Sequence, residues 1–176
     1  MKSRDSHLPF VYLKPGEVCM TGKPTKVSTV LGSCVSVTMY VPSIRFGAIC
    51  HGLLPECICK NCANCNERLK YIDCSVKYML ERIDRIGIDK NEIEVKVFGG
   101  GDVLPYFGNA TGRITVGSQN IEAAMKILKQ LGLTPKNTDL GGVNGRKLFF
   151  YTHTGEVLLK KIRKTIISDE QYGSKA

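Results

Sequence analysis

Short runs of β-branched and apolar residues alternate with two longer amphipathic segments along this chain. Residues 27–30, 35–40, 44–49 and 92–98 have the composition or the alternation of strands. Apolar positions recur at helical spacing over about 69–86 and about 119–131, with stops at Gly87 and Gly132 and a predicted N-cap at Ser118. Residues 147–152 and 156–162 predict a closing hairpin. This order predicts one mixed α+β sandwich domain over 1–176 rather than a regular βαβ alternation.

The length and composition agree with one domain. A chain of 176 residues buries a substantial core without cross-links. No apolar run reaches the roughly 18 residues of a membrane span, so we expect no membrane insertion. The opening residues, MKSRDSHLPF, lack the apolar segment of a signal peptide, so we expect a cytoplasmic location, where thiols stay reduced. The eight cysteines therefore indicate metal binding, catalysis or packing rather than a disulfide framework.

The formal net charge of +9 indicates affinity for something acidic. The basic residues are dispersed, with a modest concentration at the start of a basic C-terminal tail over about 160–176, and no zinc-finger, RRM or helix-turn-helix motif accompanies them. We interpret them as a solvated surface and expect no nucleic-acid binding, with an acidic protein partner as a further alternative. Glycine-rich stretches at 99–101 and 141–145 match no phosphate-binding motif, and we interpret them as turns that need positive φ.

Cys34 is the first candidate for chemistry, in the stretch LGSCVSV at 31–37. Gly32 and Ser33 predict a tight turn that presents the thiol at the start of a strand, and backbone N–H groups at such a turn can stabilise an oxyanion. His51 follows seventeen residues later, in CHGLLP at 50–55. A nucleophilic thiol needs an adjacent base, so the two residues form a candidate pair. A small core cysteine and a structural histidine are the competing interpretation.

These residues resemble the chemoreceptor glutamine deamidase family, CheD. The family carries a Ser/Thr-x-x-x-Gly-Ser-Cys-Val segment, a histidine seventeen residues after the cysteine and Leu-Pro shortly behind it; this chain has STVLGSCV at 28–35, His51 and Leu54-Pro55. LKPGE (13–17) resembles the family's first strand, VFGGG (97–101) its central strand and GSQNIE (117–122) the opening of its second helix. DLGGVNGRK (139–147) and TG (154–155) resemble its closing hairpin. The resemblance implies two stacked mixed β-sheets flanked by helices, an α/β/β/α sandwich like that of cytotoxic-necrotizing-factor-type cysteine hydrolases.

The resemblance also implies an activity: protein-glutamine glutaminase acting on the cytoplasmic helices of methyl-accepting chemotaxis receptors, which tunes chemotaxis signalling. Cys34 is then the nucleophile that forms a thioester, His51 is its base, and the backbone N–H groups of Ser33 and Cys34 hold the oxyanion. The family's third catalytic residue is usually a threonine six positions before the cysteine, where this chain has Ser28. Thr29 is the alternative if the register differs, because alternate strand residues face opposite sides. The family also pairs with the phosphatase CheC.

A cysteine-rich loop over 56–66 departs from the family pattern. The spacing C-x-C-x2-C-x2-C brings four thiols into one polar segment, at Cys57, Cys59, Cys62 and Cys65. This set suits a structural zinc ion better than an iron–sulfur cluster, and we expect no cofactor in catalysis itself. Cys74 is a fifth candidate ligand, whereas Cys19 and Cys50 are predicted core residues. An alternative function follows: a non-catalytic, metal-binding docking module that regulates a CheC-type phosphatase.

Overall fold

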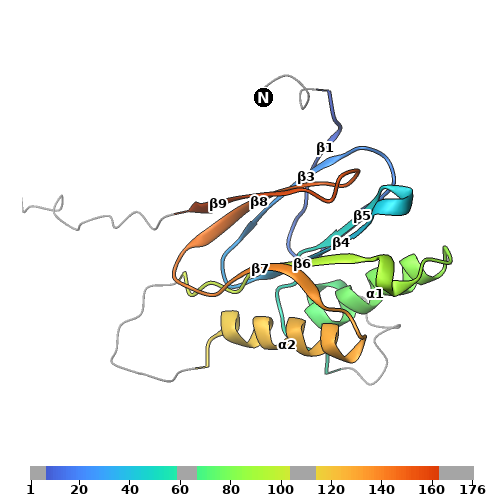
Figure 1. Ribbon diagram of the computed structural model, residues 1–176. Coiled ribbons are helices and arrows are strands. Elements are labelled where there is room, and N and C mark those ends of the chain that lie inside the picture. The colour runs from blue at the N-terminus through green and yellow to red at the C-terminus, as the bar shows by residue number, and fades with distance from the viewer. Residues whose placement is uncertain (1–6, 59–66, 104–113, 163–176) are drawn as a thin grey trace, which may run out of the picture.

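Two β-sheets pack face to face, and two helices cover the outer face of one of them (Figure 1). The computed structural model describes residues 7–58, 67–103 and 114–162. The four-stranded sheet has the order β1-β3-β8-β9, formed by β1 (Phe10–Tyr12), β3 (Lys26–Leu31), β8 (Gly145–Tyr151) and β9 (Val157–Ile162). The five-stranded sheet has the order β2-β5-β4-β6-β7, formed by β2 (Val18–Thr21), β5 (Phe46–Cys50), β4 (Val35–Val41), β6 (Glu94–Gly99) and β7 (Pro135–Leu140). The helices are α1 (Ile72–Asp84) and α2 (Val116–Gln130), with short 3-10 turns η1 (Pro42–Ile44), η3 (Arg68–Lys70) and η4 (Lys90–Glu92).

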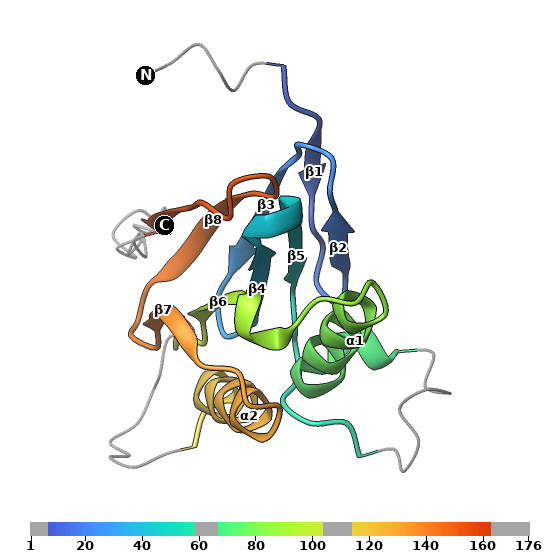
Figure 2. The same cartoon turned by 45° about the vertical axis from the view of Figure 1, so that its right-hand side comes forward.

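Both sheets are mixed, as predicted. β1 pairs in parallel with β3, and β6 pairs in parallel with β7, whereas the other strand pairs are antiparallel. The α+β class and the two stacked sheets are therefore confirmed. Both helices pack against each other and against the five-stranded sheet (Figure 2). The described residues thus form three layers, and the fourth layer of the expected α/β/β/α order is not among them. The outer face of the four-stranded sheet carries lysines over aromatic rings, and both α1 and α2 pack on the other sheet.

Strand β4 divides the interior into two parts, because its side chains alternate between the faces of the sheet. One set points toward the helices and joins the largest core cluster, formed in β4 by Val35, Val37, Met39 and Val41. Ser36 and Thr38 lie on the other face, toward the four-stranded sheet. Two smaller apolar clusters lie between the sheets, one around Ile49 and Phe150 and one around Leu31, Phe98 and Leu148. Polar side chains of β4 are therefore placed between the sheets.

Several boundaries differ from the sequence prediction. Helix α2 begins earlier than expected, because its N-cap is Thr115, and Ser118 is the N3 partner in a capping box with it. LKPGE at 13–17, predicted as a strand, lies between β1 and β2, where Gly16 has a φ of 78°. The predicted glycine turns are confirmed by positive φ at Gly99 and Gly141. Within the described residues, neither helix is long and apolar enough to cross a membrane.

Candidate active site

Cys34 and His51 lie next to each other at the end of the five-stranded sheet where β4 begins and β5 ends. The main chains of Val35 and Gly52 pair there, with Val35 N–H donating to Gly52 O at 3.0 Å and Gly52 N–H donating to Val35 O at 2.9 Å. This pair continues the antiparallel register of β4 and β5, so His51 lies opposite Ser36, and Cys34 is the diagonal neighbour of His51 on the same face. The structure therefore brings together the two residues that the sequence singled out.

Both side chains face the space between the sheets. The Cys34 thiol is partly buried against the apolar cluster of Leu31, Phe98 and Leu148. The His51 ring is 2% exposed and meets a residue of the opposite sheet, Thr29. The pair thus stands at an end of the sandwich where the thiol keeps partial access to solvent and the imidazole does not.

A hydroxyl group fixes the tautomer of His51. The Thr29 hydroxyl donates its single proton to the carbonyl oxygen of Leu13 at 2.8 Å. His51 Nδ1 lies 2.7 Å from the hydroxyl oxygen of Thr29. Because the hydroxyl proton is already donated to Leu13 O, Nδ1 must be the donor in this contact. The Nε2 atom is then unprotonated, and this buried nitrogen has no hydrogen-bond partner among the described residues. His51 therefore presents a free base on the side away from Thr29.

The choice between the two candidate hydroxyls is corrected by this contact. Ser28, the predicted orienting residue, precedes Thr29 in β3 and so faces the opposite side of the sheet. There it is paired across the strands with Tyr12 and Phe149, and it is 1% exposed. The register of β3 against β8 thus gives Thr29, and not Ser28, the position facing His51.

The turn before β2 holds the main chain of His51 on both sides. Gly16 N–H donates to His51 O at 2.8 Å, and His51 N–H donates to Glu17 O at 3.0 Å. The same turn supplies Leu13 O, the acceptor of the Thr29 hydroxyl. The LKPGE segment therefore positions His51 as a turn, and not as the strand that the sequence predicted.

The site is electrically neutral at rest. Burial lowers the pKa of His51 to about 4, against the opposing effects of the Leu13 carbonyl and the Glu17 charge. Burial also raises the pKa of the Cys34 thiol, although its own backbone N–H stabilises the thiolate. At neutral pH the pair is consequently thiol and imidazole, not thiolate and imidazolium.

The glycine-rich stretch at 99–101 supports the loop that carries Cys34. Gly100 N–H donates to Cys34 O and Gly101 N–H donates to Gly32 O, both at 2.8 Å. A side chain at Gly99 would place its Cβ only 2.2 Å from Cys34 O, and its φ of 116° also excludes other residues. These glycines therefore allow two backbones to approach closely, in addition to forming the turns that the sequence predicted.

Asn120 is a site residue that the sequence reasoning did not select. It is fully buried on α2, and its Nδ2 donates to Ser33 O at 3.0 Å and to Leu53 O at 2.9 Å. Ser33 precedes the candidate nucleophile, and Leu53 lies two residues after the candidate base. One amide group thus holds both loops. Its sequence signal was present but ambiguous: a polar residue on the apolar side of an amphipathic helix, within the GSQNIE stretch.

The cysteines outside the pair divide into two groups. Cys50 is fully buried, and burial raises its pKa to about 12, while Cys19 packs against the inter-sheet core, so both are core residues as predicted. Cys74 is 4% exposed within α1, and its role as a fifth ligand stays a prediction. Cys57 N–H donates to Asp73 Oδ1 at 3.1 Å. The other three cysteines of the loop lie outside the described residues, and no cluster of metal-binding side chains occurs within the described ones.

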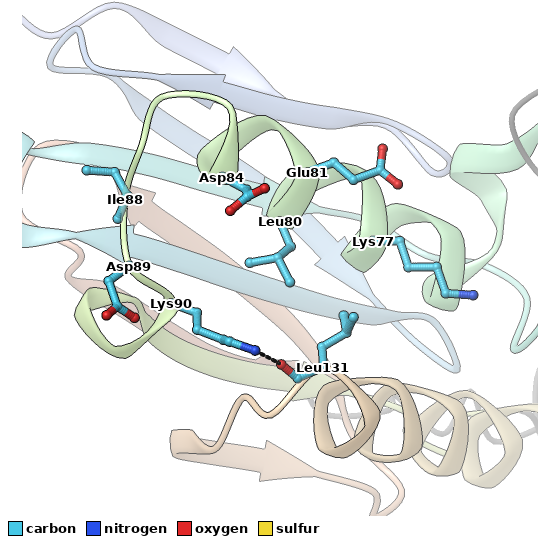
Figure 3. A pocket seen from close by; sticks show the side chains of 8 residues that line it. All are labelled: Lys77, Leu80, Glu81, Asp84, Ile88, Asp89, Lys90 and Leu131. Atoms are coloured by element: carbon cyan, nitrogen blue, oxygen red, sulfur yellow. Dashed lines mark hydrogen bonds between the residues drawn. The ribbon is translucent and has the colours of Figure 1, made fainter.

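A separate cleft of about 420 Å³ lies by the C-terminal ends of α1 and α2 (Figure 3). Apolar side chains of Leu80, Ile88 and Leu131 line it together with charged groups of both signs, including Glu81 and Lys90. Lys90 Nζ donates to the carbonyl of Leu131 at 3.4 Å. None of the candidate site residues borders this cleft.

Comparison with known proteins identifies the family of this chain. The family model described as CheD chemotactic sensory transduction matches residues 53–161. A "Probable chemoreceptor glutamine deamidase CheD 2" of Geobacter sulfurreducens is 48% identical, over 94% of this chain and 98% of that protein. Proteins described as "Probable chemoreceptor glutamine deamidase CheD" from Maridesulfovibrio salexigens and Methanococcus maripaludis are 39% and 32% identical, over 93% and 85% of this chain and 98% and 93% of their own lengths. The chain belongs to the CheD family.

Proposed function

We propose that this protein deamidates glutamine side chains of chemoreceptors to glutamate, with Cys34 as the nucleophile and His51 as its base. The observation that carries the proposal is the chain of hydrogen bonds from His51 Nδ1–H to the Thr29 hydroxyl and from that hydroxyl to Leu13 O, which leaves Nε2 unprotonated in a residue that is the diagonal neighbour of Cys34 on the same face of the sheet. Members of the same family described as chemoreceptor glutamine deamidases provide the substrate class. The proposed location is the cytoplasm, where the thiols that this chemistry needs stay reduced.

The first half of the reaction releases ammonia. As the thiol approaches the glutamine carboxamide, His51 Nε2 takes its proton and the sulfur bonds to the carboxamide carbon. The proton on Nε2 then passes to the departing nitrogen, the C–N bond breaks, and a thioester remains on Cys34. Thr29 accepts from Nδ1–H throughout, so it stabilises the imidazolium that exists between the two transfers. Ammonia leaves with the proton that the thiol supplied.

The oxyanion of the tetrahedral intermediate requires donors close to the sulfur. The carbonyls of Gly32 and Ser33 are engaged by Gly101 N–H and by Asn120. Since a trans peptide is planar, the N–H groups of Ser33 and Cys34 in those same units point away from these partners. The Cys34 N–H lies close enough to its own sulfur to lower the thiol pKa. These two N–H groups are the donors we assign to the oxyanion.

The second half of the reaction regenerates the thiol. A water molecule attacks the thioester while His51 Nε2 accepts one of its protons. The C–S bond then breaks, the proton returns from Nε2 to the sulfur, and the product is glutamate. The balance is one amide and one water converted to one carboxylate and one ammonium ion. No metal or other cofactor takes part in these steps.

The proposed function is tested by incubating the protein with the cytoplasmic fragment of a chemoreceptor and measuring the fragment's mass. Deamidation adds about one dalton per site and releases one ammonia, and both changes should disappear with Cys34→Ala. A docking module for a CheC-type phosphatase would give no mass change with either form. Failure of the wild-type protein on a fragment that another CheD deamidates would overturn the proposal.

We also propose a structural zinc ion held by the cysteine-rich loop at 56–66. The support is its sequence spacing, because four thiols in a short polar stretch have neither burial nor disulfides as a ready explanation. The loop begins beside α1, where Asp73 holds the backbone of Cys57. Zinc there would close the segment that links the His51 loop to α1, and so stabilise it.

A further inference from the structure

The outer face of the four-stranded sheet carries a regular arrangement of basic and apolar side chains. Cross-strand partners form three rows: Phe10, Lys26 and Tyr151; Tyr12, Ser28, Phe149 and Leu158; and Val30, Lys147 and Lys160. Strand alternation places these rows opposite Val27 and Phe150, which belong to the inter-sheet core. We call this surface the lysine face and define it by the residues of the three rows.

Four apolar side chains of the lysine face are exposed, three of them on its two edge strands and one in its third row. Phe10 is 59% exposed, Tyr12 51%, Leu158 46% and Val30 39%. Both helices lie on the other sheet, and nothing else among the described residues covers these side chains (Figure 2). Exposed apolar groups beside basic ones suit a partner that offers both apolar and acidic groups.

The charge of the lysine face is positive. Lys26 Nζ lies 4.8 Å from the ring centre of Phe149, and Lys147 Nζ lies 5.2 Å from the same centre. Such contacts hold the ammonium groups on the surface. The three rows contain no Asp or Glu, and the nearest carboxylate along β9, Glu156, borders the first row. A partner that complements this face has acidic groups beside apolar ones.

The lysine face is also continuous with the candidate active site. Strand β3 runs along the rows from Lys26 to Val30 and then enters the loop that ends at Cys34. The third row is therefore the one next to the nucleophile loop. A protein segment bound on this row lies at the end of β3 that leads into the loop carrying Cys34.

We propose that the lysine face is the docking surface for the substrate protein and binds an acidic, amphipathic segment of the chemoreceptor. This inference rests on the proposed function and adds where the substrate binds and what chemistry is recognised. Nucleic acid is the less favoured occupant of such a basic, aromatic sheet. Lys26 and Lys147 both lie against the ring of Phe149, which leaves that ring unsuited to stacking on a base.

The test is a charge reversal with a matched control. The double variant Lys147→Glu/Lys160→Glu changes the third row, and Arg85→Glu/Lys129→Glu changes the net charge equally at exposed positions by the ends of the two helices. With a receptor fragment as substrate, we expect KM to rise at least tenfold in the first variant, with kcat within about twofold. The control should stay within about twofold in both. Raising the salt from about 50 to about 200 mM should weaken binding of the wild type more than of the first variant.

Cys34 alkylation by iodoacetamide at about pH 9, where thiolate is available, should proceed at the wild-type rate in both variants and so report an intact site. If the wild type deamidates the fragment and KM is unchanged in Lys147→Glu/Lys160→Glu, the docking proposal fails while the proposed function stands. Binding of a single-stranded oligonucleotide that the same substitutions abolish, with unchanged KM, would assign the face to nucleic acid and overturn the proposal. A wild-type dimer that this variant dissociates, again with unchanged KM, would overturn it in favour of a second copy.

Discussion

At His51, one neighbouring hydroxyl determines which ring nitrogen accepts a proton. Thr29 gives its proton to Leu13 O and therefore receives one from Nδ1, so the lone pair is on Nε2. The ring is buried and neutral, and its pKa of about 4 keeps it a base across the physiological range. Cys34 and His51 thus form a pair of neutral thiol and neutral imidazole, with the imidazole in a fixed tautomer, and we predict the effects of two changes to this pair.

The first concerns the two neighbouring hydroxyls of β3. Thr29→Val keeps the shape but removes the acceptor, so kcat should fall by about ten- to a hundredfold. Thr29→Ser should keep most of the activity, since it restores the hydroxyl. Ser28→Ala is the matched control and should change kcat less than about twofold, because Ser28 faces away from His51. A larger loss in Ser28→Ala than in Thr29→Val, measured by ammonia release, would reverse the assignment.

The second concerns pH. The pKa of His51 is about 4 in the folded protein and about 6.5 when unfolded, so the unfolded chain binds the proton first as pH falls. The stabilisation that comes from keeping His51 neutral is complete above about pH 6.5 and is lost as the pH falls from about 6.5 to about 4. This loss lowers the free energy of unfolding by an amount on the order of 3 kcal/mol. Activity should likewise fall only near about pH 4. Urea unfolding of wild type and His51→Gln at about pH 7 and about pH 4.5 measures this, and identical pH dependence in the two proteins would refute it.

At the scale of elements, the site depends on where strands and helices end. Cys34 precedes β4 and His51 follows β5, and the glycines after β6 hold the loop between β3 and β4. The N-terminal part of α2 adds Asn120, which joins the two loops through Ser33 O and Leu53 O. Three elements distant in sequence therefore set the position of one pair of side chains.

Asn120 supplies the element-scale prediction for catalysis. Asn120→Leu has a similar shape but no donor, so two carbonyls lose their partner and the loops are free to separate. We expect kcat to fall about tenfold or more with KM nearly unchanged, together with about 1–3 kcal/mol of lost stability. Gln119→Leu, the exposed neighbour on the same helix, should leave kcat unchanged. A rise in KM as large as the fall in kcat, or an unchanged kcat, would show that Asn120 does not position Cys34 and His51.

The cysteine-rich loop at 56–66 supplies a second prediction at this scale. Freshly purified protein should contain about one zinc per chain, and Cys59→Ser/Cys62→Ser should contain none, whereas Cys19→Ser should keep it. Loss of the ion should also lower activity, because the loop leads from the His51 segment into α1. Elemental analysis that finds neither zinc nor iron, with the loop thiols titrating freely, would rule out the site.

The sequence predicted some of these elements better than others, for physical reasons. Strands β4 and β6 have β-branched, alternating residues, so they were found, whereas β7 is polar and begins with Pro135, which hides the strand pattern. The pair Cys34 and His51 followed from a motif. The choice between Ser28 and Thr29 did not, because one residue of register decides the face and register is set by β8, far along the chain.

At the scale of the whole molecule, the proposed catalytic pair and the proposed docking surface lie on opposite faces of the four-stranded sheet. Cys34 and His51 lie between the two sheets, the helices pack on one sheet, and the outer face of the other sheet is positively charged and covered by neither helix (Figures 1 and 2). Part of the net charge of +9 comes from the lysines of the lysine face, whose third row lies next to the loop that carries Cys34. We propose that the glutamine side chain of a bound receptor reaches Cys34 where the lysine face meets the candidate active site.

The most direct measurement of that claim is the mass of the protein during turnover. A short glutamine-containing receptor peptide is mixed with the protein, the reaction is quenched in acid within its first turnover, and the intact chain is weighed and digested. The account predicts an adduct equal to the peptide minus ammonia, a loss of about 17 Da, on the fragment that contains Cys34, and none with Cys34→Ala. An adduct on another cysteine, or deamidation that continues undiminished in Cys34→Ala, would contradict it.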